Sequence, residues 1–171
     1  AAERLLKRID EEIAERGLLD VLRKGVADHG VRFDLAYFSP ETGLNEETRR
    51  LYAGNIFSVV RQVQYSNQNE NTIDMVLFLN GLPLWTTELK NQLTGQSVKN
   101  GIMQYKTDRD PREKLLSFKR CLAHFAVDTE QAFVATRLAG LRTQFLPFNK
   151  GHEHSAGNPP NPDGYKTAYL W

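Results

Sequence analysis

Apolar positions along the chain change their spacing, and this change predicts an ordered succession of helices and strands. In the first 30 residues they recur at helical intervals that stop at Gly17 and Gly30. From residue 57 they alternate or run together as in strands, and helical spacing returns after residue 95. The pattern predicts helices over 2–15, 18–28, 95–105 and 110–122, a helical turn over 46–51, and extended segments over 31–38, 57–65, 72–79, 82–90, 131–136 and 143–148. This order predicts an α/β sandwich with a mixed sheet.

The strongest local signal is a hairpin at Asn80-Gly81, which separates two apolar runs. Three charged residues lie in these runs, with Asp74 in the first and Glu88 and Lys90 in the second. Burying three charges in a sheet is costly unless they pair with one another or with a metal ion. Two carboxylates and an ammonium group on neighbouring strands can hold Mg²⁺ and activate a water, which is the chemistry of phosphodiester hydrolysis.

The register of the hairpin decides whether these charges meet. With a two-residue turn, Asp74 would face Thr87, and Glu88 would point to the other face of the sheet. An odd-numbered loop or a bulge would instead bring Asp74 and Glu88 to roughly 5–8 Å from each other. We therefore predict a three-residue loop with Gly81 in the left-handed conformation, which also places Lys90 on the shared face. The alternative is a solvated Glu–Lys pair on the open face of an edge strand.

Composition narrows the class of protein. The 171 residues are 40% hydrophobic and 25% charged, as in one globular domain with a sizeable core. A formal net charge of +1 gives no general attraction to nucleic acid, so a DNA-binding face must be a local patch. Acidic residues are interleaved with the basic residues that follow the hairpin, which favours a solvated surface for many of them: Lys99, Lys106, Arg109, Arg112, Lys114, Lys119 and Arg120.

Cysteine, histidine and hydropathy patterns exclude several other classes. The single cysteine, Cys121, excludes an intramolecular disulfide and a cysteine-rich zinc site, and it fits a reducing compartment. The sequence shows no signal-peptide core and no apolar run near eighteen residues, so we expect a cytoplasmic protein without a membrane partner. His152 and His154 lack a third ligand nearby in a loop-like stretch, and a solvated loop is the better interpretation.

Several motifs give the chain a family resemblance. They are ELKN at 88–91, QYKTDRDP at 104–111, FKRCLAHFAVDT at 118–129, TRLAG at 136–140, FLPFNK at 145–150 and GYKTAYLW at 164–171. Over roughly residues 19–171 the chain resembles the N-terminal nuclease region of the R (restriction and motor) subunit of type I restriction-modification enzymes.

The resemblance implies the PD-(D/E)xK restriction-endonuclease-like fold, a mixed central sheet flanked by helices. It implies that Asp74 and Glu88 bind Mg²⁺, with the backbone carbonyl of Leu89 as a further ligand. Lys90 would orient or deprotonate the attacking water. The expected activity is that of a type I site-specific deoxyribonuclease, which cuts double-stranded DNA.

The helix after the active strand departs from the family pattern. Many R subunits carry a Gln-x-x-x-Tyr motif there, and Tyr105 matches its tyrosine, whereas Gly101 stands at the glutamine position. We expect Gln104 and Tyr105 to support the active site or to contact DNA. A surface polar residue beside a packing tyrosine is the alternative.

The resemblance also implies partners outside this chain. No Gly-x-x-x-x-Gly-Lys-Ser/Thr motif occurs, so ATP would be used by motor domains that the sequence lacks. We expect residues 1–171 to be a single nuclease domain of a longer protein, whose cutting requires the methyltransferase (M) and specificity (S) subunits. A stand-alone nuclease of the same fold, similar to a junction resolvase, and a non-catalytic DNA- or partner-docking module remain as alternatives.

Overall fold

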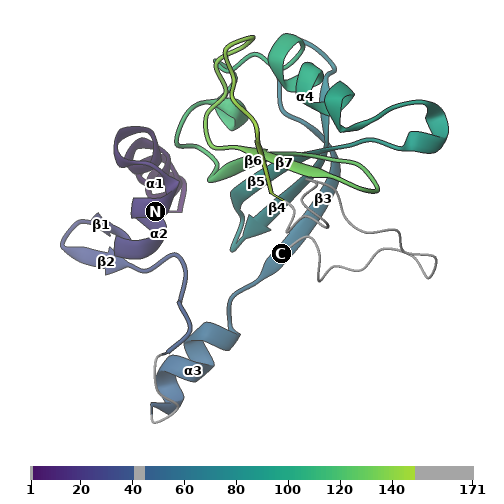
Figure 1. The fold of residues 1–171 in the computed structure, drawn as a ribbon. Coiled ribbons are helices and arrows are strands. Elements are labelled where there is room, and N and C mark those ends of the chain that lie inside the picture. Colours follow the sequence, from purple (N-terminus) through teal and green to yellow (C-terminus); the bar gives the residue numbers. More distant parts are fainter. Residues whose placement is uncertain (1, 41–44, 149–171) are drawn as a thin grey trace.

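A six-stranded mixed sheet forms the centre of the computed structural model, which describes residues 2–40 and 45–148 (Figure 1). Its neighbouring strands are antiparallel, except that β5 and β6 are parallel. In spatial order the strands are β3 (Phe57–Gln64), β4 (Thr72–Leu79), β5 (Leu82–Leu89), β6 (Ala123–Val127), β7 (Ala132–Ala135) and β8 (Leu146–Pro147). With helices beside it, this sheet is of the PD-(D/E)xK type that the sequence predicts.

Helices α1 (Ala2–Arg16) and α2 (Leu18–Lys24) lie on one side of the sheet and α4 (Val98–Thr107) lies on another, whereas α3 (Glu46–Ala53) lies away from the sheet (Figure 1). No helix in the described part of the chain is long and apolar enough to cross a membrane. The elements are α1 (Ala2–Arg16), α2 (Leu18–Lys24), the two-stranded pair β1 (Val26–Asp28) and β2 (Val31–Phe33), α3 (Glu46–Ala53), the 3₁₀ turn η1 (Gln92–Thr94), α4 (Val98–Thr107) and the 3₁₀ turn η2 (Lys114–Leu116).

Two hydrophobic clusters hold the helices against the sheet. One joins α1, α2 and β1 to the hairpin end of β4 and β5, where Leu79 and Leu84 are buried. The other joins α4 to β4, through Tyr105 against Ile73 and Val76. The two clusters support both ends of the β4–β5 hairpin, which therefore provides a rigid base for its charged residues.

The tip of the β4–β5 hairpin corrects the prediction of a three-residue loop. Leu79 pairs with Leu82, so the turn has two residues, and Asn80 (φ 49°) and Gly81 (φ 83°) take the left-handed conformations of a type I′ turn. The one-residue shift occurs further along the strands, because Leu77 pairs with Trp85 and Phe78 with Pro83. Leu84 is thus the extra residue of a β-bulge, and its buried side chain lies in the cluster under α1 and α2.

The predicted helix over 110–122 is wrong. The Asp110 carboxylate accepts hydrogen bonds from the backbone and side chain of Arg112, which makes a local turn, and the chain then forms only η2. Lys119 has a φ of 72°, outside the helical region. The Leu122 amide donates a hydrogen bond of 2.7 Å to the Leu84 carbonyl, and β6 begins at the next residue. The apolar pattern of the sequence does not distinguish β6 from the segment before it, so the sequence does not predict this strand.

Two other helices differ at their ends from the prediction. Helix α2 ends at Lys24 instead of residue 28, because Gly25 has a φ of 67° and donates to Val21 as a C-cap. Helix α4 begins at Val98 instead of residue 95, because Ser97 and Asn100 form a capping box at its start. The extended segments predicted over 131–136 and 143–148 contain β7 and β8, which pair with each other in antiparallel fashion.

Candidate active site

The bulge at Leu84 determines which side chains of β4 and β5 meet. Below it, Met75 pairs with Thr87, so Asp74 and Glu88 occupy the next facing positions of the ladder. The ammonium group of Lys90 lies 4.0 Å from Asp74 Oδ2 and 3.9 Å from Glu88 Oε2. The structure thus brings together the three charged residues that the sequence singles out, by a route other than the predicted loop.

Hydrogen bonds from both neighbouring strands hold the Asp74 carboxylate. Its Oδ2 atom accepts a hydrogen bond of 2.9 Å from the Leu89 amide, and its Oδ1 atom accepts one of 3.2 Å from Gln62 Nε2. The Lys90 amide donates to β6, at Val127 O. Because the peptide bond is trans, the Leu89 carbonyl points away from β6 and toward the β4 side, where Asp74 lies.

Gln62 is a contributor to the site that the sequence does not reveal. It lies opposite Asp74 in β3, because the pairs on either side of it are Arg61 with Met75 and Val63 with Ile73. Its φ of 51° is unusual for this residue type within a strand. Its side chain donates to Asp74 and accepts from Thr72 Oγ1 at 2.8 Å, so local backbone strain accompanies an orienting contact.

Glu88 is a fully buried carboxylate with its two oxygens in different surroundings. Oε1 accepts a 2.8 Å hydrogen bond from Arg109 Nε, whereas Oε2 accepts none in the part of the chain that the structure describes. Burial raises the pKa of Glu88 to about 7, and this effect outweighs the Arg109 contact, which lowers the pKa. A buried carboxylate oxygen that accepts no hydrogen bond is energetically unfavourable unless a ligand compensates for it. Oε2 is therefore a position where a cation could bind.

Arg109 is the counterion of Glu88. Its guanidinium also donates to the Thr72 carbonyl at 2.9 Å and lies 5.7 Å from the centre of the Tyr65 ring. The basic residues of this region are expected to lie on a solvated surface, but only 5% of Arg109 is exposed, so the prediction is wrong for this residue. Its partner Glu88 is 21 residues away in the sequence, and no local pattern of residues links the two.

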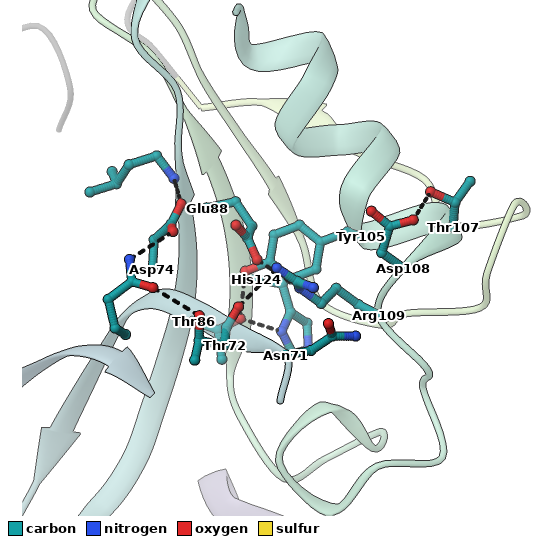
Figure 2. A network of polar contacts seen from close by, with 12 residues as sticks. Asn71, Thr72, Asp74, Thr86, Glu88, Tyr105, Thr107, Asp108, Arg109 and His124 are labelled. Atoms are coloured by element: carbon teal, nitrogen blue, oxygen red, sulfur yellow. Dashed lines mark hydrogen bonds and ion pairs between the residues drawn. The ribbon is translucent and has the colours of Figure 1, made fainter. Parts of the chain in front are cut away.

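Tyr105 supports β5 from beneath and does not reach the surface. Its hydroxyl lies 2.7 Å from Thr86 Oγ1, which in turn lies 2.8 Å from His124 Nδ1 (Figure 2). Burial lowers the pKa of His124 to about 4 and raises that of Tyr105, so both side chains are neutral near pH 7. Because Tyr105 has no exposed surface, its side chain is not placed to contact DNA. Of the two expected roles, support of the active site is the one that fits its position.

Gln104 lines an open depression of about 550 Å³ beside Asp74. The depression is rich in acidic groups, because Glu70, Asp74 and Asp108 surround it with Arg109 as the only basic residue among its lining. The negative charge of these carboxylates opposes the approach of a phosphate. A bound divalent cation would offset this repulsion.

Gly101 allows α4 to approach the active strand closely. A Cβ atom there would lie 3.3 Å from the Ala126 Cβ, 3.5 Å from the Lys90 Cγ and 3.6 Å from the Glu88 Cβ. The contacts with Lys90 and Glu88 are ordinary van der Waals distances, whereas the one with Ala126 is tight, so a side chain at this position would require α4 and β6 to separate by a few tenths of an ångström. Gln104, one position before Tyr105, supplies an amide beside the site instead.

The donor atoms at the site suit a hard cation. Asp74, Glu88 and the Leu89 carbonyl offer only oxygen atoms, which Mg²⁺ prefers. Within residues 2–40 and 45–148 the structure contains no group of three or more His, Cys, Asp or Glu side chains placed to hold a metal ion. His152 and His154 lie outside the described residues.

Comparison with models of protein families identifies the family of the chain. The family model of the type I restriction enzyme R protein N terminus matches residues 11–143, which include all the site residues described above. The chain belongs to this family. No curated protein and no solved structure matches the chain significantly. Membership in the R-protein N-terminus family supports a restriction endonuclease role, and the family in general acts on DNA together with M and S subunits.

Proposed function

We propose that the chain is the Mg²⁺-dependent endonuclease domain of a type I restriction enzyme and that it hydrolyses phosphodiester bonds of double-stranded DNA at Asp74, Glu88 and Lys90. The observation that carries this proposal is the Oε2 atom of buried Glu88, which accepts no hydrogen bond among the described residues and lies 3.9 Å from Lys90 Nζ, beside Asp74. A structural salt bridge between Glu88 and Lys90, as in a mere docking module, is not favoured, because Glu88 takes Arg109 as its hydrogen-bonded partner.

Asp74, Glu88 and the Leu89 carbonyl would hold the Mg²⁺ ion. When bound, the cation would lower the pKa of water and offset the charge of the scissile phosphate. Gln62 and the Leu89 amide fix the Asp74 carboxylate, so this ligand does not need to be ordered when the cation arrives.

Lys90 would orient the attacking water and stabilise the phosphate. Its side chain is only 10% exposed, and both of its carboxylate contacts exceed hydrogen-bond length. The ammonium group can therefore donate to a water oxygen and to a phosphate oxygen. Attack by water would form a new bond to phosphorus while the bond from phosphorus to the 3′ oxygen breaks. The attacking water would release its proton to solvent, and the 3′ oxygen would leave as an oxyanion that takes up a proton from solvent.

We expect the domain to cut without reading the base sequence. Contacts to phosphates carry no base information, and the site presents carboxylates and one ammonium group to the backbone of the DNA. The S and M subunits would determine which DNA sequence is recognised, and motor domains that use ATP would control when cutting occurs.

Substitution of Asp74 tests the proposal. In the full R subunit, we expect Asp74→Asn to weaken Mn²⁺ binding, measured by calorimetric titration, and to abolish Mg²⁺-dependent cleavage by the assembled enzyme. Asp108→Asn is the matched control, since Asp108 lines the same depression and, in the described part of the chain, its carboxylate accepts a side-chain hydrogen bond only from neighbouring Thr107. Unchanged Mn²⁺ binding and cleavage in Asp74→Asn would show that the site is not the nuclease centre.

A further inference from the structure

Arg109 lies in the site but has no role in the reaction described above. It follows α4, and it joins Glu88 of β5 to Thr72 at the start of β4. Thr72 is two residues before Asp74. A single guanidinium therefore connects the two strands that carry the two acidic residues of the site.

The contacts of Arg109 divide the Glu88 carboxylate into two unlike oxygens. Oε1 is occupied by Arg109 at 2.8 Å, and Oε2 is buried without a hydrogen bond among the described residues. Oε2 is also the atom nearer to Lys90, on the side where Asp74 lies. A carboxylate without Arg109 could rotate and offer both oxygens to a cation, as carboxylates do in bidentate coordination.

We propose that Arg109 is a positioning residue that occupies Oε1 of Glu88 and leaves only Oε2 to bind a divalent cation. The inference rests on the proposed function, since it assigns a coordination mode to the same site. Metal-binding side chains are commonly oriented by hydrogen bonds from residues behind them, and loss of such a partner weakens the metal site.

The geometry requires arginine and not merely a positive charge. The guanidinium donates through Nε to Glu88 and through a terminal nitrogen to the Thr72 carbonyl, and the Tyr65 ring lies beside it. Its planar fork fixes both donors at once, whereas the ammonium group of a lysine is a single point on a flexible stem. Lysine would preserve the charge and lose part of the orientation.

Mn²⁺ titration of the full R subunit tests this role. Binding that persists in Asp74→Asn is subtracted, so that only the site at Asp74 and Glu88 is measured. We expect Arg109→Gln to weaken Mn²⁺ binding by about 10- to 100-fold and Arg109→Lys to restore part of the loss. Arg112→Gln is the matched control, because Arg112 is exposed and pairs with Asp110 outside the site, and it should bind as the wild type does.

Mn²⁺ binding in the folded fraction of Arg109→Gln that is as tight as in the wild type, or tighter, would overturn the inference. Such a result would mean that Arg109 only neutralises Glu88 or competes with the cation. If Arg109→Gln does not fold, the wild-type crystal structure with Mn²⁺ decides. We expect the anomalous peak beside Oε2 with Arg109 still on Oε1, and Mn²⁺ on both oxygens with Arg109 displaced would overturn the inference.

The two proposals fail in different ways. Binding that depends on Asp74 but is indifferent to Arg109 would remove the positioning role and leave the nuclease proposal intact. Mn²⁺ binding that does not depend on Asp74 would overturn the nuclease proposal and this inference with it.

Discussion

Burial of Glu88 should make the metal-free protein less stable as the pH rises toward neutrality. Desolvation raises the pKa of Glu88 from 4.5 to about 7 in the folded protein, despite the Arg109 contact. In the unfolded chain the group loses its proton near pH 4.5, so between pH 4.5 and about 7 the folded state holds one more proton. The contribution to stability is therefore fully present below pH 4.5 and is lost as the pH rises to about 7.

The size of this effect follows from the interval between the two pKa values. Each pH unit removes about 1.4 kcal/mol, so the interval from 4.5 to about 7 lowers the free energy of unfolding by about 3 kcal/mol. The neighbouring Asp74 also contributes to the raised pKa, and because Glu88 is fully buried, solvent screening does not reduce the change much.

Urea unfolding of wild type and Glu88→Gln, in EDTA from about pH 5 to about pH 8, measures this contribution. Because part of the change lies below pH 5, the wild type should lose about 2.5 kcal/mol more than the variant across this range. Mn²⁺ should reduce the loss, because it favours the ionised carboxylate. Glu15→Gln, at an exposed position of α1, is the control and should keep the wild-type slope. A wild-type slope equal to that of Glu88→Gln would refute the reasoning.

Three further outcomes are expected. Thr86→Val removes the hydroxyl that contacts the Tyr105 hydroxyl and His124, so it should lower the free energy of unfolding in urea by about 2–4 kcal/mol. Thr86→Ser keeps the hydroxyl and should stay near wild type, and a loss below about 0.5 kcal/mol in Thr86→Val would contradict this account. Burial raises the pKa of Cys121 to about 12, so a thiol reagent should modify it only after unfolding, and rapid reaction of the folded protein would be against this account. Gln62→Asn tolerates the left-handed backbone but is too short to orient Asp74, so cleavage by the assembled enzyme should fall without loss of stability, and unchanged cleavage would remove the orienting role.

The hairpin shows how much of the site can be predicted from the sequence. Asp74, Glu88 and Lys90 would be costly to bury apart from one another, and this reasoning correctly predicts a one-residue shift in the register of the hairpin. Its position cannot be predicted from the turn, because Asn80-Gly81 satisfies a type I′ turn of two residues. The bulge lies at Leu84, where burial against α1 and α2 decides which residue is extra, and this is a tertiary contact that local sequence does not contain.

The segment after α4 shows where local signals mislead. Asp110-Pro111 has the form of a helix start, but the Asp110 carboxylate bonds to Arg112, and the chain turns back toward the sheet. Arg109, just before it, belongs to a charged stretch that is typical of a solvated surface. Its burial against Glu88 follows from the fold alone, since nothing near it in the sequence identifies its partner.

Substitution of Lys90 tests the central claim most directly. In the assembled type I enzyme with ATP and Mg²⁺, we predict that Lys90→Ala translocates along DNA as the wild type does and cuts it at least about 100-fold more slowly. Lys99→Ala, at an exposed position of α4, is the matched control and should cut normally. Cleavage at the wild-type rate by Lys90→Ala, with normal translocation, would contradict the assignment of the nuclease site.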